Sequence, residues 1–369
     1  MNGLTKIRLS GWKSIREVEL PLGPLNVLIG ANGSGKSNFI SYFKFLNEMS
    51  EGRLQEYIAR VGGAESLLHY GAKQTPFIEA ELQFTTPSGE SAYYQRLAHA
   101  VTDTLIFTDE RLRFFERPGS PSEEYLGAGH RETILRGGGV FDKESVRILS
   151  RLINSCRVYH FHDTSAEAPI RSSGYIEDNT YLHADGRNLA AILYRYRQTA
   201  TLRPVYDRIV STISQVNPRF GDFVLEPRAL NPSQIMLNWR EKSRDYLFGP
   251  HQLSDGTLRV MALTTLLLQP ENELPSVMVI DEPELGLHPY AIGVLAALLR
   301  KVSHYSQVIV STQSAELLNY FEPDEVIVAN RKGEESEFRR LTATELDAWL
   351  EEYTLSELWE KNVLGGGPH

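Results

Sequence analysis

The residues best suited to chemistry stand near the start of the chain, where Gly30 to Ser37 fits the pattern Gly-x-x-x-x-Gly-Lys-Ser/Thr. An apolar run, 25–29, precedes the pattern and an amphipathic stretch follows it, so we expect a loop between a strand and a helix. Glycines let backbone N–H groups turn toward phosphate oxygens, and the following helix adds its positive end. The lysine reaches the β- and γ-phosphates and the serine hydroxyl binds Mg²⁺. The pattern therefore predicts a nucleoside triphosphate site, and the residues expected to contact the nucleotide are Asn32, Gly33, Ser34, Gly35, Lys36, Ser37 and Asn38.

A second motif places two carboxylates, Asp281 and Glu282, directly after the apolar run 277–280. A buried strand would deliver both side chains at its carboxyl end. We expect Asp281 to bind Mg²⁺ together with Ser37, and Glu282 to polarise the attacking water. Taken alone, the pair could be an acidic strand end facing solvent, but its occurrence with the phosphate-binding loop favours catalysis.

A third motif, Leu253 to Thr257, stands just before a predicted helix. It resembles the signature loop of ABC-type ATPases, normally Leu-Ser-Gly-Gly-Gln, and departs from it at Asp255 and Thr257. The Ser254 hydroxyl and the Gly256 N–H keep two groups that can bind a γ-phosphate. The alternative is that Ser254 or Asp255 is only a helix N-cap.

Further segments resemble the RecF, SMC and OLD branch of ABC-type ATPases. Glu284 to Pro289 resembles its D-loop, and Gly11 to Ile15 resembles a segment near its start, which implies that Lys13 contacts the nucleotide from the side. Gln313 follows the next predicted strand, where many ABC-type ATPases have a switch histidine. It can hydrogen-bond the γ-phosphate or the water without carrying charge, or simply cap the strand end. The catalytic residues expected are thus Glu282, Lys36 and Gln313, and the sequence assigns no Q-loop glutamine.

The resemblance implies an α/β fold, a P-loop NTPase with ABC-ATPase head architecture. We expect a mostly parallel core sheet, an antiparallel β subdomain and a short helical insert. The head would consist of an N-terminal lobe (1–115), an insert (116–240) and a C-terminal lobe (241–369). In this family the signature of one subunit closes over ATP held by another, which implies ATP and Mg²⁺ as cofactors, ATP hydrolysis, and a head-to-tail homodimer.

Apolar periodicity predicts the elements that position these motifs. The predicted strands are 4–9, 18–20, 25–29, 77–84, 92–97, 223–225, 235–239, 277–280 and 307–311, with hairpin material at 105–115. The predicted helices are 38–49, 189–196, 205–216, 256–268 and 290–302. The stretch 118–139 is rich in Gly, Pro and Ser and is predicted to be a surface loop.

Composition limits the class of protein. The 369 residues are 41% hydrophobic and carry a net charge of −9, which argues against a protein coated in nucleic acid. The single cysteine, Cys156, excludes an internal disulfide. The sequence shows no signal peptide and no apolar run of about 20 residues, so we expect a cytoplasmic protein with no membrane contact.

Two kinds of partner remain open from the sequence. Arginines at 187, 195, 197 and 203, with tyrosines between them, could contact DNA phosphates or form a solvated helix face. Small ATPases of this branch often act with a nuclease or other effector in DNA repair or phage defence, and the acidic C-terminal region could dock one or be solvated. Competing interpretations are the nucleotide-binding subunit of an ABC transporter, which the segment 284–289 disfavours, a P-loop kinase or GTPase, and a scaffold with vestigial ATP binding.

Overall fold

We describe a computed structural model of the chain over residues 3–86, 89–116, 121–135 and 144–367. It divides into two compact units. The first contains Met1–Val158, Pro275–Val279 and Ser306–His369, and the second contains Tyr159–Leu274 and Ile280–Tyr305. Within the described ranges, no helix is long and apolar enough to cross a membrane.

The first unit begins with an antiparallel sheet in the order β2-β1-β4-β5-β6-β7. Its strands are β1 (Gly3–Trp12), β2 (Ile15–Pro21), β4 (Phe77–Thr86), β5 (Gly89–Ala100), β6 (Thr104–Glu116) and β7 (Ser122–Gly127). Apolar side chains pair across the strands, as where Ile7 lies opposite Leu20 and Leu9 opposite Val18. These pairs lie on the buried face, so the alternation in the sequence sets the register.

A second sheet has the order β17-β16-β3-β15-β14-β8. Its strands are β3 (Leu25–Ile29), β8 (Cys156–Tyr159), β14 (Val277–Asp281), β15 (Gln307–Thr312), β16 (Val326–Lys332) and β17 (Glu335–Arg340). The strand β3 pairs in parallel with β15 and β16, whereas β17 is antiparallel to β16. All residues of β3, β14 and β15 are buried, as expected of parallel strands covered on both faces.

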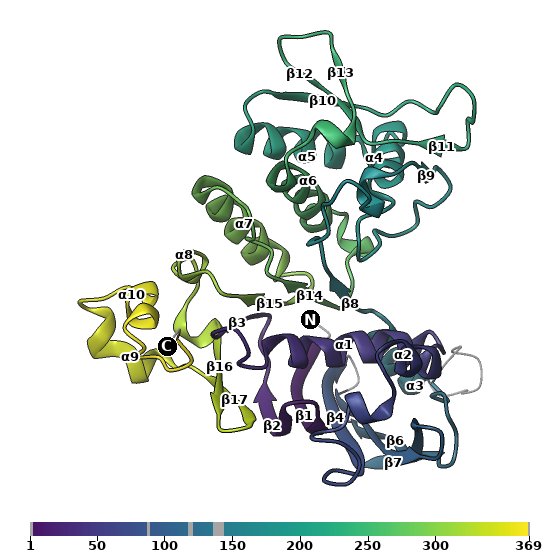
Figure 1. The fold of residues 1–369 in the computed structure, drawn as a ribbon, viewed down its shortest axis with the longest axis vertical. Helices are drawn as coiled ribbons and strands as arrows, with labels where there is room; N and C mark the ends of the chain where they lie inside the picture. The colour runs from purple at the N-terminus through teal and green to yellow at the C-terminus, as the bar shows by residue number, and fades with distance from the viewer. Residues whose placement is uncertain (1–2, 87–88, 117–120, 136–143, 368–369) are drawn as a thin grey trace. The chain divides into compact units, whose positions relative to one another are not determined.

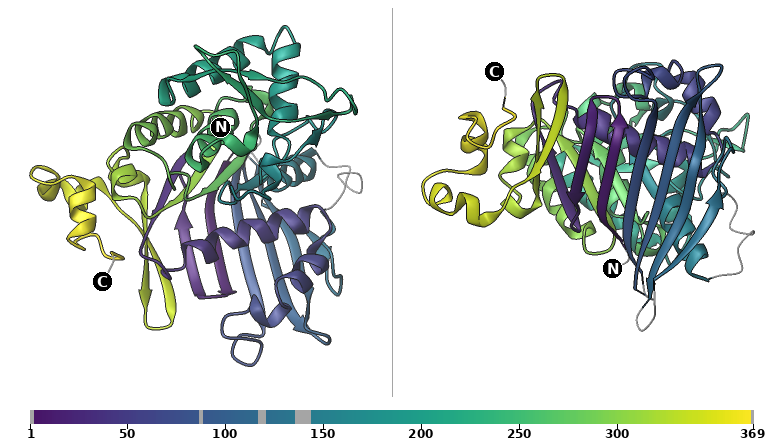
Figure 2. Two further views of the ribbon diagram at one scale, coloured as in Figure 1. Left: turned by 45° about the horizontal axis from the view of Figure 1, so that its top comes forward. Right: turned by 90° about the horizontal axis from the view of Figure 1, so that it is seen from below.

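Helix α1 fills the core of the first unit. It runs across one face of the antiparallel sheet (Figures 1 and 2). Its aromatic side chains Phe39, Phe43 and Phe45 belong to one apolar cluster with residues of both sheets. Because α1 directly follows the phosphate-binding loop, this packing fixes the position of the loop. The helices of this unit are α1 (Lys36–Ser50), α2 (Leu54–Arg60), α3 (Glu144–Asn154), α8 (Ala315–Leu318), α9 (Ala343–Leu350) and α10 (Leu355–Glu360).

The second unit is mainly helical with short strand pairs (Figure 1). Its helices are α4 (Leu189–Gln198), α5 (Arg203–Val216), α6 (Asp255–Leu267) and α7 (Pro289–Val302). The strand β10 (Phe220–Val224) pairs with β12 (Asn238–Glu241), which pairs with β13 (Leu247–Phe248), and β9 (Gly174–Tyr175) pairs with β11 (Gln234–Ile235). This unit carries the signature loop at the start of α6.

The architecture confirms the predicted fold class, including the antiparallel subdomain. Two local predictions were wrong. The segment predicted as a surface loop contains β7, because residues 122–127 pair with β6, and the rest of that segment lies partly outside the described residues. The strand predicted over 235–239 is split between β11 and β12. The sequence also gave no sign of α3 and β8. The division into three segments at 115 and 240 stays a prediction.

Candidate functional site

The phosphate-binding loop has the conformation that its glycines permit. Gly33 and Gly35 have φ angles of 78° and 107°, in the region that L side chains rarely adopt. A Cβ at Gly30 would lie 2.4 Å from the carbonyl oxygen of Ala329, and one at Gly35 would lie 2.1 Å from Ser336 Oγ. Around Gly33 the space is open, with no atom of the described residues within 4 Å of such a Cβ. The loop is therefore tightly braced at both ends and open at its middle, where a ligand can approach the backbone.

The side chains of the loop leave groups suited to an anion. Lys36 is buried, and its ammonium donates to the carbonyl oxygens of Gly30 at 2.5 Å and Ala31 at 3.1 Å. The buried Ser34 hydroxyl finds no hydrogen-bond partner within the described ranges. Likewise no described side chain caps the N-terminus of α1, which leaves early N–H groups of a 15-residue helix to a ligand. Ser37 is exposed at the same end of the helix.

The segment before β2 supports the loop from the side. Trp12 is fully buried and its indole N–H donates to the carbonyl oxygen of Asn38 at 2.8 Å. The Asn38 amide donates to Ser14 Oγ at 2.7 Å, and Ser14 shares a 2.7 Å hydrogen bond with Ser336. The structure thus gives the Asn38 side chain a partner within the fold, in addition to the nucleotide contact predicted from sequence.

Lys13 occupies a strained backbone conformation in this segment. Its φ angle is 48°, in the left-handed region that costs energy for a residue with a Cβ. The backbone is held there because the N–H donates to Leu67 O at 2.8 Å and the carbonyl oxygen contacts His69 Nδ1 at 2.6 Å. Burial lowers the pKa of the Lys13 ammonium. Strain that surrounding contacts maintain at a partly desolvated lysine is typical of a functional position.

Gln313 lies beside the entry to the phosphate-binding loop. The end of β15 pairs in parallel with the end of β3, with Thr312 opposite Ile29, so both strands deliver their next residues at the same edge. Gln313 follows at once and is exposed. The first unit thus brings Gln313 to the strand edge from which the loop with Lys36 departs.

The end of β14 carries the predicted carboxylates of the second motif. Asp281 is buried, and its Oδ1 has no hydrogen-bond partner among the described residues. Glu282 has a φ angle of 42°, a second predicted site residue in the left-handed region. The backbone thus turns sharply directly after a buried strand, and such strain is compatible with the predicted catalytic role of Glu282.

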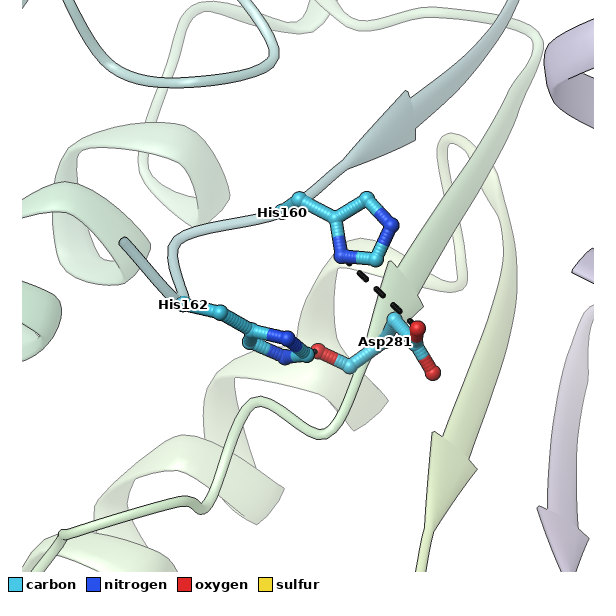
Figure 3. Close-up of side chains that lie close together, drawn as sticks. All are labelled: His160, His162 and Asp281. Carbon is cyan, nitrogen blue, oxygen red and sulfur yellow. Dashed lines mark hydrogen bonds and ion pairs between the residues drawn. The ribbon is translucent and has the colours of Figure 1, made fainter. Parts of the chain in front are cut away.

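Two histidines flank Asp281 that the sequence interpretation missed. His160 and His162 follow β8, and both point toward the end of β14 in Figure 3. The His160 Nδ1 lies 3.7 Å from Asp281 Oδ2, and His162 Nε2 lies 2.8 Å from the backbone oxygen of Asp281. The segment 156–159 before them contains Arg157 and is not an apolar run, so no local pattern pointed to these histidines.

A buried arginine donates hydrogen bonds to the signature loop and supports it. Ser254 caps α6, since its Oγ accepts from the N–H of Thr257 at 3.2 Å, and its additional role in binding a γ-phosphate stays a prediction. Arg171, only 4% exposed, donates to Asp255 Oδ1 at 2.7 Å and to Leu253 O at 3.1 Å. Asp255, which departs from the family motif, thus serves as an anchor. Ser254 itself stays exposed.

A second buried arginine joins the signature helix to its neighbours. Arg259 donates to the carbonyl oxygens of Phe161 at 3.0 Å, His162 at 2.9 Å and Leu285 at 2.7 Å. At the start of the helix, a Cβ on Gly256 would lie 2.5 Å from Gly286 O, so only glycine allows this approach. The signature, the histidine segment and the segment after Glu282 therefore form one hydrogen-bonded assembly within the second unit.

The arginines considered for DNA binding have acidic or backbone partners. Arg195 donates to Glu273 at 2.5 Å, and Arg203 pairs with Asp207 at 2.9 Å. Arg187 lies 3.8 Å from Asp185, and Arg197 donates to the carbonyl oxygen of Phe223 at 3.4 Å. Acids thus offset part of the positive charge that the sequence concentrates here: Glu273 is distant in sequence, whereas Asp207 and Asp185 are near their partners.

The chemical groups of the described residues suit the phosphates of ATP and Mg²⁺. The open backbone at Gly33, the unpartnered hydroxyl of Ser34 and the ammonium of Lys36 suit phosphate oxygens. In the first unit the exposed hydroxyl of Ser37, and in the second unit the buried oxygen of Asp281 that has no partner among the described residues, are each oxygen donors of the kind that Mg²⁺ takes.

Solved structures that are similar to this chain in fold include heads of SMC proteins. A crystal structure of an SMC head bound to the C-winged helix domain of ScpA superposes with a TM-score of 0.59 at 16% identity, covering 94% of this chain and 99% of that chain. A head derived from Pyrococcus furiosus gives 0.58 at 16%, covering 95% and 99%. One from Pyrococcus yayanosii gives 0.56 at 12%, covering 95% and 99%. At these identities the likeness establishes the fold.

The sequence itself identifies the family. No curated protein matches the chain. A family model described as "AAA domain, putative AbiEii toxin, Type IV TA system" matches residues 25–319, which span the phosphate-binding loop, the signature and both carboxylates. The chain therefore belongs to this family of AAA-type ATPase domains, and it shares the fold of SMC heads.

Proposed function

We propose that the protein is a Mg²⁺-dependent ATPase switch that forms a head-to-tail homodimer around two ATP molecules. Each protomer supplies the loop with Lys36 to one site and the signature with Ser254 to the other. Hydrolysis of ATP to ADP and phosphate then releases the dimer. The observation that carries the proposal is the exposed signature serine, held at the start of α6 by the buried Arg171. An exposed, rigid phosphate-binding group suits a partner's nucleotide.

The predicted site residues divide the tasks of phosphate binding, metal binding and hydrolysis. The loop 32–36 and the start of α1 hold the phosphates, with Lys13 at the side, and Ser37 and Asp281 hold Mg²⁺. The bound cation neutralises charge on the phosphates. Glu282 accepts a hydrogen bond from the attacking water and orients it, and Gln313 contacts the water or the γ-phosphate. Ser254 and the N–H of Gly256 contact the γ-phosphate held by the other protomer.

An effector protein is the proposed target of the switch. The family description names a putative toxin of a type IV toxin–antitoxin system, and the SMC heads of similar fold carry ScpA. We therefore place this ATPase in genome maintenance or phage defence with a separate effector, such as a nuclease. Direct DNA contact through the α4 region is the weaker alternative, because Arg195 and Arg203 are already paired with acids.

Complementation between two inactive variants tests the shared site. Lys36→Ala removes the phosphate-binding ammonium, and Ser254→Arg obstructs the signature. Each variant alone should lack ATPase activity. A mixture forms heterodimers with one intact site, because the Ser254→Arg chain supplies the loop and the Lys36→Ala chain supplies the signature. Random pairing predicts recovery of about a quarter of wild-type turnover.

The control mixture combines Lys36→Ala with the double variant Lys36→Ala/Ser254→Arg. It contains no intact loop and should stay inactive. If the first mixture is as inactive as its components, while the Ser254→Arg protein still binds ATP, the head-to-tail arrangement is wrong. Full activity of Ser254→Arg alone would equally contradict it.

A further inference from the structure

Three side chains of the second unit converge at the end of β14 in a way that ATP binding does not require. One nitrogen each of His160 and His162 and one oxygen of Asp281 all lie within 4.8 Å of one another (Figure 3). The His160–Asp281 pair is already at 3.7 Å. Ligand atoms around a tetrahedral Zn²⁺ are about 3.4 Å apart, given bonds of about 2.1 Å. Small side-chain rotations would therefore bring the three atoms to one ion.

The hydrogen bond of His162 prepares its ring for a metal. A backbone carbonyl oxygen only accepts, so the contact at 2.8 Å between His162 Nε2 and Asp281 O places the proton on Nε2. In the neutral ring Nδ1 then keeps its lone pair. Histidines that bind metals usually donate their second N–H to a carbonyl or carboxylate in this manner, which fixes the tautomer.

The carboxylate gives a second sign that a cation binds here, through the same oxygen atom that also suits Mg²⁺. Asp281 is 8% exposed, and its Oδ1 finds no hydrogen-bond partner among the described residues. An unpaired oxygen of a buried carboxylate costs free energy that a cation would recover. The His160 side chain remains 29% exposed, so an ion can enter from solvent.

We propose that His160, His162 and Asp281 form a site for a transition-series divalent cation. Two imidazoles and one carboxylate favour ions such as Zn²⁺, whereas Mg²⁺ prefers an octahedron of oxygens. The site does not require nucleotide. Because Asp281 is also the proposed Mg²⁺ ligand, a bound transition metal withholds it from Mg²⁺, which makes the site a metal-sensitive brake on the ATPase.

Calorimetric titration of the full, nucleotide-free chain with ZnCl₂ tests the proposal. Wild type should bind one Zn²⁺ per chain in a large excess of Mg²⁺. His160→Gln and His162→Gln should each weaken binding by about 100-fold, since each loses a ligand nitrogen. Gln at 162 keeps an N–H donor for the Asp281 carbonyl, and far-UV circular dichroism checks that both variants fold. His304→Gln changes an exposed histidine outside the cluster and should bind like wild type.

Visible absorption of Co²⁺ in place of Zn²⁺ reports the geometry. An intense band from a low-coordinate Co²⁺ should appear in wild type and in His304→Gln, and disappear in both cluster variants. The proposal is overturned if wild type binds no Zn²⁺, or if folded His160→Gln and His162→Gln bind it as tightly as wild type. Neither result bears on ATP-driven dimer formation, since no nucleotide is present.

Discussion

Asp255 shows at the scale of one residue how this signature departs from the family motif. Where the family has glycine, the carboxylate of Asp255 receives Arg171 Nη2 at 2.7 Å, and the same guanidinium holds the carbonyl oxygen of Leu253. Arg171 is 4% exposed, so its charge depends on these partners. The loop backbone is thereby positioned through a side chain that the common motif lacks.

Asp255→Ala should therefore reduce turnover without reducing ATP binding to the loop that contains Lys36. The Asp255 side chain is 62% exposed, which weakens the pair, so we expect a decrease of about tenfold in the rate. Steady-state ATPase assays and equilibrium binding of Mg-ATP measure the two effects. Asp207→Ala removes an exposed aspartate that also pairs with an arginine, Arg203, and should leave both unchanged. Wild-type turnover in Asp255→Ala would contradict the anchoring role.

Other site residues could be predicted from sequence only where their role is local. The loop 30–37 follows a strand and precedes a helix within a short window, so its type and place were evident. The roles of Arg171 and His162 were not evident. Arg171 contacts Leu253, more than 80 positions away, and His162 contacts Asp281, more than 100 positions away. Their roles arise from tertiary contacts of the second unit, about which local patterns carry no information.

At the scale of elements, a buried polar network ties β6 to the segment after β7. Glu110 on β6 is fully buried and accepts from Tyr93 Oη at 2.7 Å, from the Thr133 hydroxyl, and from the N–H of Ile134 at 3.2 Å. His130 Nε2 lies 2.8 Å from the same carboxylate. These contacts hold residues 130–134, which follow β7, against β6. The composition of 118–139 predicted a loop. That prediction failed because the long-range pairing of residues 122–127 with β6 overrides local preference.

Glu110→Ala should destabilise the first unit strongly. It leaves several buried donors without an acceptor, which costs about 3 kcal/mol. Urea denaturation followed by circular dichroism measures the change in free energy of unfolding. Glu90→Ala, an exposed position on the neighbouring strand β5, should change stability little. Equal stability of the two variants would show that the network does not hold the segment.

The strand β8 contains the only cysteine of the sequence, Cys156. The burial of the Cys156 side chain leads to a second prediction for the elements of the first unit. Burial raises the pKa of Cys156 from 9.0 to about 12. The folded thiol therefore stays protonated at pH 8 and should react with a thiol reagent only after unfolding. The unfolded thiol ionises above pH 9 while the folded one does not, so this group's contribution to stability falls between pH 9 and 12. Rapid labelling of folded protein at pH 8 would contradict the burial of β8.

At the scale of the whole molecule, charge patterns in the sequence were the least reliable guide. The arginines around α4 stand in a stretch without acids, yet Arg195 pairs with Glu273, 78 positions away. The overall architecture was predictable because motif order in this family carries fold information. The antiparallel sheet was part of that predicted fold class, whereas the division into two units and the surface chemistry had to await the tertiary structure.

The central claim is that ATP joins two copies of this chain, and a hydrolysis-deficient variant tests it most directly. In Glu282→Gln the amide cannot serve as the water-polarising carboxylate, so Mg-ATP should stay bound and the dimer should persist. Light scattering during gel filtration in saturating Mg-ATP should then give a mass of about twice the 41.7 kDa of one chain. In ADP, the mass of one chain is expected.

The variant Glu282→Gln/Ser254→Arg provides the matched control, because it retains the ATP-binding loop and loses the signature contact. It should bind Mg-ATP and remain at the mass of one chain. A Glu282→Gln protein that binds Mg-ATP yet stays monomeric would contradict the account, as would dimers that form equally well with Ser254→Arg present.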